Sequence, residues 1–164
     1  MVMYRVSKVS PFHVRSLLAV IGILHRCGKN MATQQNLQHW NNSVLKNAVI
    51  LVLCLLKKNT IYLVLDVENR PVATFQTRRC GTDLRFQKLA TEPAYAGRGI
   101  GSFCMEQIEG EAKNNGCQRV CMEVYDKSLH AIHFYEKRGY TICGTVNTLK
   151  YTELTMEKQL KVIR

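Results

Sequence analysis

Proline and glycine are scarce in this sequence, which has three prolines and ten glycines among its 164 residues. So few of either exclude a proline-rich or glycine-rich low-complexity segment, and no internal repeat is present. Long apolar runs are also missing, because the stretches 16–24 and 48–56 fall well short of the ~20 residues that a membrane helix needs. No small-residue cleavage site follows 16–24, as a secretion signal would require. We therefore place both stretches in the core and predict no membrane partner.

Cysteine pairs of the zinc-binding or redox kind are absent. No Cys-x-x-Cys occurs, and no His stands beside Cys117 or Cys121 at a zinc-ligand spacing. The number of cysteines is also odd. We predict no metal, a cytoplasmic location where thiols stay reduced, and free thiols at positions 27, 54, 80, 104, 117, 121 and 143.

Acidic residues are the minority among the charges. The sequence has 12 Asp and Glu against 23 Lys and Arg, which gives a formal net charge of +11. Such a charge favours anionic partners. The basic residues are scattered, however, and the tightest clusters are only Lys57-Lys58 and Arg78-Arg79. Without a basic cluster or an aromatic-basic motif, we predict no nucleic-acid partner.

Apolar periodicity and turn residues predict an α/β domain around one central, mostly antiparallel sheet, extending over residues 1–164. Ser10-Pro11 has the pattern of a helix start and Gly28 that of a helix stop, so a first helix is expected over 11–27. Residues 29–43 are expected to form a loop. The apolar segment 44–57 suits a buried helix or a strand, and its Leu, Ala and Lys content favours helix. The remaining predictions are strands at 3–7, 61–66, 72–79, 82–91, 119–125, 140–147 and 151–159, and helices at 100–115 and 129–138.

A glycine-rich turn connects the predicted strand 82–91 to the predicted helix 100–115. Its sequence is Ala96-Gly97-Arg98-Gly99-Ile100-Gly101-Ser102. The glycines allow a tight turn and close approach to a ligand. The amides of the turn and of the first helical turn then form an anion site suited to a diphosphate, with Arg98 at its rim. The Gly-Lys-Ser/Thr ending of a nucleotide-binding P-loop is missing.

Two motifs in this region resemble those of the GNAT superfamily of acyl-CoA-dependent N-acetyltransferases. Residues 89–101 are similar to its acyl-CoA loop, in which a strand feeds an Arg/Gln-x-x-Gly-x-Gly/Ala turn that opens a helix. Residues 128–140 resemble its second motif, Asn-x-x-Ala-x-x-Phe/Leu-Tyr-x-x-x-Gly-Phe. The resemblance covers residues 84–140. It implies the GNAT fold: a twisted, mixed, mostly antiparallel sheet of six to seven strands flanked by about four helices.

The resemblance also implies a function, an N-acetyltransferase that moves an acetyl group from acetyl-CoA to a primary amine by direct attack. It assigns Tyr135 as general acid toward the departing thiolate. It assigns the cofactor-binding positions to Leu89, Ala90, Thr91, Ala96, Gly97, Arg98, Gly99, Ile100, Gly101, Ser102, Ser128 and Tyr135. The strands that end near Thr91 and Tyr125 are expected to splay and admit the cofactor.

Two positions depart from the family pattern. Ala96 stands where Gln or Arg is usual, and Ser128 replaces the Asn that bonds the pantetheine arm. These departures leave open an alternative, a non-catalytic acyl-CoA-binding or sensor module on the same fold. The general base is not evident, and Glu123 and His133 are the candidates.

The acceptor is expected to be a small-molecule or peptide amine. A protein of charge +11 repels polycations, so we predict a neutral or acidic acceptor. The acceptor groups are expected from the first helix, the loop 28–43 and the last strand pair. If the apolar segment 48–56 is helical, a partner subunit is one way to cover it, which predicts a possible homodimer; burial within the monomer is the other.

Overall fold

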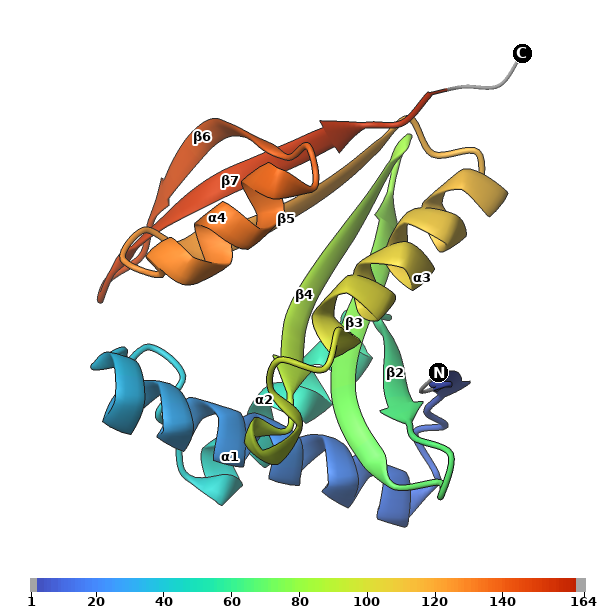
Figure 1. The fold of residues 1–164 in the computed structure, drawn as a ribbon, viewed down its shortest axis with the longest axis vertical. Coiled ribbons are helices and arrows are strands. Elements are labelled where there is room, and N and C mark those ends of the chain that lie inside the picture. Colours follow the sequence, from blue (N-terminus) through green and yellow to red (C-terminus); the bar gives the residue numbers. More distant parts are fainter. Residues whose placement is uncertain (1–2, 162–164) are drawn as a thin grey trace.

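The computed structural model describes residues 3–161 and places a seven-stranded mixed sheet between four helices (Figure 1). The sheet order is β1-β2-β3-β4-β5-β7-β6, and within the described residues only the β4–β5 pair is parallel. The predicted fold class is confirmed. The elements are β1 Arg5–Lys8, α1 Val14–Gln35, α2 Val44–Leu56, β2 Thr60–Leu65, β3 Pro71–Cys80, β4 Asp83–Thr91, a 3-10 turn Pro93–Tyr95, α3 Ile100–Asn114, β5 Arg119–Tyr125, α4 Leu129–Lys137, β6 Thr141–Asn147 and β7 Thr152–Gln159.

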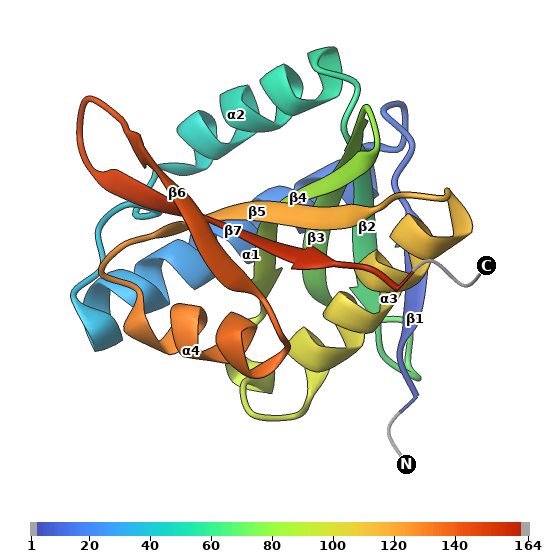
Figure 2. The same cartoon turned by 90° about the horizontal axis from the view of Figure 1, so that it is seen from above.

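The core lies in two layers, one on each face of the sheet. Helices α1 and α2 lie on one side and α3 and α4 on the other (Figure 2). Neighbouring residues of β2 divide between these layers, with Leu63 packed in the α1–α2 layer and Val64 in the layer beneath α3. This alternation is the period-2 pattern of a strand buried on both faces.

Strands β4 and β5 pair only at their beginnings and then separate. Their register runs from Asp83↔Arg119 to Arg85↔Cys121, and beyond it the two strands diverge (Figure 1). On its other edge β4 carries a bulge, because its pairing with β3 shifts between Thr74 and Gln76. Lys88 lies at this bulge with a φ of 53°, in the left-handed region that non-glycine residues rarely occupy. The expected splaying of the two strands is therefore present.

Helix α1 differs from its predicted bounds at both ends. Its N-cap is His13, whose ring accepts a hydrogen bond from the Ser16 amide, rather than Ser10. It also continues through Gly28 to Asn36, whose left-handed backbone ends it. Gly28 is needed for close packing instead of termination, because a Cβ atom there would lie 1.9 Å from the Trp40 carbonyl oxygen. The predicted loop 29–43 is therefore helical up to Gln35.

Helix α2 was expected to be buried in the monomer or covered by a partner, and the structure excludes the first alternative. Only three of its residues are buried, among them Leu51 and Cys54. Its outer face exposes six large apolar side chains to between 50% and 75%, namely Val44, Leu45, Val49, Val52, Leu53 and Leu56. We call these six residues the α2 face. Across residues 3–161, no helix is long and apolar enough to cross a membrane.

Candidate active site

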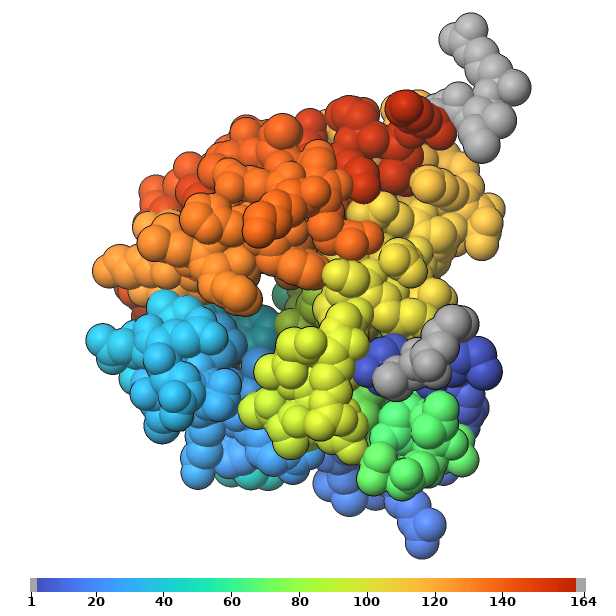
Figure 3. Space-filling model, viewed as in Figure 1, coloured from blue at the N-terminus to red at the C-terminus, as the bar shows by residue number. Residues whose placement is uncertain are grey.

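The separation of β4 and β5 opens a cleft of about 480 Å³ through the molecule. Figure 3 shows the hollow from outside, between α4 and the C-terminal end of α1. Strands β4 and β5 form its walls, α4 contributes Ser128, Ala131 and Tyr135 from one side, and the end of α1 with the following loop closes the other. The edge of β4 beyond Arg85 has no strand partner on the β5 side among the described residues, so its backbone groups are open to a ligand.

The predicted diphosphate loop lies at one end of this cleft, where Pro93 and Ala96 line it. Gly97 and Gly99 have φ values of 75° and 76°, and a Cβ atom at either would meet nothing within 4 Å. Glycine is therefore required at both positions by the backbone conformation and not by lack of space. Within residues 3–161, the amides of residues 97–102 have no hydrogen-bond partner, whereas the next amide, of Phe103, bonds the Gly99 carbonyl. Six amide donors remain available at the start of a helix of fifteen residues.

Arg98 is held at the rim of this loop. Its guanidinium lies 4.8 Å from the centre of the Tyr95 ring, and its carbonyl oxygen accepts a hydrogen bond from the Tyr4 hydroxyl at 3.4 Å. The stacking keeps the cation near the open amides, where it adds to their positive potential.

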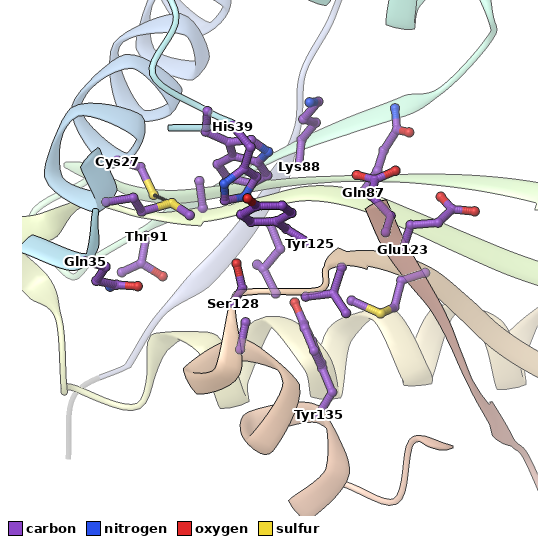
Figure 4. A pocket seen from close by; sticks show the side chains of 18 of the residues that line it. Cys27, Gln35, His39, Gln87, Lys88, Thr91, Glu123, Tyr125, Ser128 and Tyr135 are labelled. Carbon is purple, nitrogen blue, oxygen red and sulfur yellow. Dashed lines mark hydrogen bonds between the residues drawn. The ribbon is translucent and has the colours of Figure 1, made fainter. Parts of the chain in front are cut away.

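Tyr135 projects from α4 into the cleft, toward Ser128 and Tyr125 (Figure 4). The residue is buried, and its ring packs against Phe86 and Tyr140. Burial and the nearby Cys104 thiol raise the pKa of the Tyr135 phenol above its usual value. The hydroxyl is therefore protonated at neutral pH and available as a donor.

The predicted cofactor-binding residues either line the cleft or lie in the turn and helix start that follow Ala96. Ser128 is buried, and its hydroxyl has no hydrogen-bond partner in the described chain. It occupies the N-cap of α4 without capping it through its side chain, so the oxygen stays free. Those residues of the set that line the cleft itself are Leu89, Ala90, Thr91, Ala96, Ser128 and Tyr135. Those that form the adjoining turn and helix start are Gly97, Arg98, Gly99, Ile100, Gly101 and Ser102.

The two candidate bases have different surroundings. Glu123 lines the cleft, but its carboxylate forms an ion pair with Arg85 across the two strands. His133 is exposed on α4 and is not among the residues that line the cleft. The structure brings neither of them to the cleft as an unpaired base.

An aromatic group at the far end of the cleft was not predicted from the sequence. The ring of His39 lies 4.4 Å from that of Tyr125 and 6.0 Å from that of Tyr151, measured between centroids. Burial, with a contribution from the charge of Lys88, lowers the pKa of His39 to about 4, so its imidazole is neutral at physiological pH. The available signal was the pair His39-Trp40 within an otherwise polar loop.

Comparisons with known proteins agree with this geometry. The model of the acetyltransferase (GNAT) family matches residues 26–140, more than half of the chain. The uncharacterised protein YdhI of Bacillus subtilis (strain 168) is 42% identical over 43 residues, 26% of this chain and 27% of YdhI. Streptothricin acetyltransferase of Streptomyces lavendulae is 29% identical over 66 residues, 40% of this chain and 35% of that protein. The matches thus span about a quarter to a third of these curated relatives.

Solved structures show the same fold over nearly the whole chain. The ribosomal-protein-S18-alanine N-acetyltransferase from Escherichia coli superposes with a TM-score of 0.75 at 15% identity, covering 99% of this chain and 97% of that one. Other structures of this fold hold coenzyme A. The matched family model, the open β4–β5 cleft and the glycine turn at its mouth lead to one assignment: this chain belongs to the GNAT acetyltransferase family.

Proposed function

We propose that residues 1–164 act as one GNAT N-acetyltransferase domain that transfers an acetyl group from acetyl-CoA to a primary amine. One observation carries the proposal: the β4–β5 cleft is lined both by Tyr135 and by Ala96, and Ala96 directly precedes the open amides of residues 97–102. The amides suit the diphosphate of the cofactor. The unpaired edge of β4 at Leu89–Thr91 and the free Ser128 hydroxyl suit its polar pantetheine arm.

Amine attack on a thioester needs a donor for the developing oxyanion and a proton for the departing thiolate. The unpaired amides of β4 supply the hydrogen-bond donors for the oxyanion. Tyr135 supplies the proton for the thiolate, because its raised pKa keeps it protonated, and the proton that the attacking nitrogen loses as the amide forms restores the phenol. Burial raises the pKa of a thiolate as well as that of a phenol, so a dry cleft preserves the small difference between a phenol near 10 and a thiol near 8.5. Proton transfer therefore stays feasible inside the cleft.

Calorimetry with coenzyme A and thiol release from acetyl-CoA over an amine panel test this function. Tyr135→Phe should lower kcat by about 10²- to 10⁴-fold, the range for general acid catalysis. Tyr140→Phe is the matched control. That hydroxyl donates to Glu109 at 3.3 Å, away from the cleft lining, so its loss should affect stability and not turnover.

Two other outcomes would decide against the proposal. Binding of coenzyme A without turnover of any amine, unchanged by Tyr135→Phe, would identify the alternative, a non-catalytic acyl-CoA-binding or sensor module. Absence of coenzyme A binding would remove both functions.

The proposed function also includes an acceptor class, a cellular location and an oligomeric state. The acceptor is a small-molecule or peptide amine that is not polycationic, in keeping with the net charge of +11. The seven free cysteines support a cytoplasmic location, which cell fractionation checks. The exposed α2 face supports a homodimer.

A further inference from the structure

A second hollow, of about 480 Å³, adjoins the cleft beyond the aromatic group. The two share His39, Lys88, Tyr125 and Tyr151, which therefore form the boundary between them. The second hollow takes the rest of its lining from the loop after α1, from the first turns of α2 and from the turn between β6 and β7. These residues are Asn36, Gln38, Asn41, Asn42, Lys46, Ile50 and Lys150. We call this hollow the lysine chamber, because Lys46, Lys88 and Lys150 line it and no Asp or Glu does.

Lys88 is the centre of this arrangement. The β4 bulge holds its backbone at a φ of 53°, and its Nζ lies 5.3 Å from the centre of the Trp40 ring. Its ammonium forms no ion pair with any residue of 3–161. Burial lowers the pKa of Lys88, and the Cys54 thiol and the Glu153 carboxylate only partly oppose that effect. A partly buried cation on strained backbone, without a carboxylate in ion-pair contact, is unfavourable by itself.

The other two lysines add positive charge on the same side. Lys46 comes from the first turn of α2 and Lys150 from the β6–β7 turn, so three elements far apart in sequence supply one cationic surface. Like charges that converge on one hollow repel one another unless an anion neutralises them. The chamber is therefore electrostatically complementary to a carboxylate or a phosphate.

The cleft side of the boundary has the opposite sign. Glu153 on β7 lines the cleft and forms no ion pair with a residue of the described chain. It is the register partner of Tyr125 in the β5–β7 pairing, which places it beside the shared boundary. An acceptor whose anionic group lies in the lysine chamber can therefore present its ammonium to Glu153, on the side that leads to Tyr135.

We propose that the acceptor is a primary amine that carries a carboxylate or phosphate group, and that Lys88, with Lys46 and Lys150, binds this anionic group in the lysine chamber. This inference rests on the proposed acetyltransferase function. The inference goes beyond that function by naming the chemical class of the acceptor and the residues that select this acceptor. The aromatic rings of His39, Tyr125 and Tyr151 then enclose the chain between the amine and the anion.

Matched acceptor pairs test the selection. Initial rates are measured for ω-amino acids of two to six carbons against their carboxamides, and for phosphoethanolamine against ethanolamine. The anionic member of at least one pair should have a kcat/KM about tenfold or more above its neutral partner, which corresponds to one charge-assisted hydrogen bond. The carboxylate and phosphate pairs show which anion is preferred.

Substitutions assign the preference to the chamber. Lys88→Met should reduce the preference for the anionic acceptor at least tenfold, mainly through KM of that acceptor. The affinity for coenzyme A should be unchanged. Lys46→Met and Lys150→Met, at exposed positions, should each reduce the preference less. Lys113→Met is the matched control, because it removes the same charge from an exposed position on α3, across the sheet from the chamber, and should leave the preference intact. Thermal melts identify any variant that fails to fold, and the two exposed lysines then carry the test.

A binding measurement keeps the subsite testable without turnover. Trp40 is the only tryptophan of the sequence and lies against the Lys88 ammonium, so its fluorescence reports an anion at that position. Titration with N-acetyl-β-alanine in the presence of coenzyme A should change the emission saturably, whereas N-acetyl-β-alaninamide should not.

The outcomes separate the two proposals. Coenzyme A binding and acetylation of neutral amines, with no preference for anions and no saturable fluorescence change, would refute the anion subsite and leave the acetyltransferase intact. A preference that survives both Lys88→Met and the double substitution of Lys46 and Lys150 would also refute it. No coenzyme A binding, with a saturable and Lys88-dependent fluorescence change, would refute the acetyltransferase and support the anion subsite.

Discussion

Replacing Gly99 by alanine separates the role of the glycine turn in folding from its role in binding. The backbone of Gly99 has a φ of 76°, and an added Cβ would meet no atom within 4 Å. Gly81, in the turn between β3 and β4, has a φ of 61° and equally open surroundings. The two substitutions thus impose the same kind of backbone strain, one at the proposed diphosphate site and one outside it.

The expected magnitudes follow from that comparison. An alanine forced into the left-handed region costs about 1–2 kcal/mol, so both variants should melt about 2–8 °C below the wild type. Relief of the strain at Gly99 would also turn the neighbouring amides away from the cleft. Loss of one hydrogen bond to a charged group costs about 1.5–3 kcal/mol, or about 10- to 150-fold in Kd. Gly99→Ala should therefore weaken coenzyme A binding by that factor, and Gly81→Ala should leave it unchanged.

Thermal melts and calorimetry provide the two readouts. Pantetheine, which lacks the diphosphate, should bind Gly99→Ala and the wild type alike. The reasoning fails if Gly99→Ala loses stability as Gly81→Ala does but keeps the wild-type affinity for coenzyme A, since the amides of residues 97–102 would then not hold the diphosphate.

Three further predictions concern stability and assembly. Gly28→Ala places a Cβ against the Trp40 carbonyl and should lower the free energy of unfolding by about 3 kcal/mol in denaturant melts. Gly22→Ala meets only the end of a flexible side chain and should be neutral or stabilising by up to about 1 kcal/mol. Equal effects of the two substitutions would contradict the packing argument. Burial lowers the pKa of His39 to about 4, so on acidification the unfolded chain takes up this proton before the folded one does. The free energy of unfolding should therefore fall as the pH drops from about 6.5 to 4. His39→Gln should flatten this pH dependence, and an unchanged slope would exclude His39 as its source. The α2 face predicts dimers by light scattering at tens of micromolar that Leu53→Glu dissociates, and a monomeric wild type would end that prediction.

The sequence by itself determined the order of elements and the chemistry of the glycine turn. These features depend on local conformation. Left-handed backbone at Gly97 and Gly99 requires glycine, and a helix of amphipathic residues such as α4 shows its period wherever it packs. The position of Tyr135 could be predicted for the same reason, since it follows from spacing along one helix once the family motif is recognised.

Local signals also misled at two places. Gly28 has the pattern of a helix stop, yet it lies inside α1 because the loop at Trp40 passes too close for a side chain. Ser10-Pro11 has the pattern of a helix start, yet His13 caps the helix. In both cases a contact or hydrogen bond outside the expected motif outweighed an intrinsic preference.

Only the tertiary structure decided what faces the acceptor side of the cleft. Lys88 lies on a strand, and nothing in its neighbours along the chain shows that a bulge turns it toward Trp40 or that Lys46 and Lys150 arrive beside it. His39 likewise becomes a neutral, enclosed imidazole only because Tyr125 approaches from the end of β5 and Tyr151 from the turn between β6 and β7. Backbone conformation is specified by a few adjacent residues, whereas burial and charge at a site are sums over residues far apart in sequence, and those sums exist only once the chain has folded.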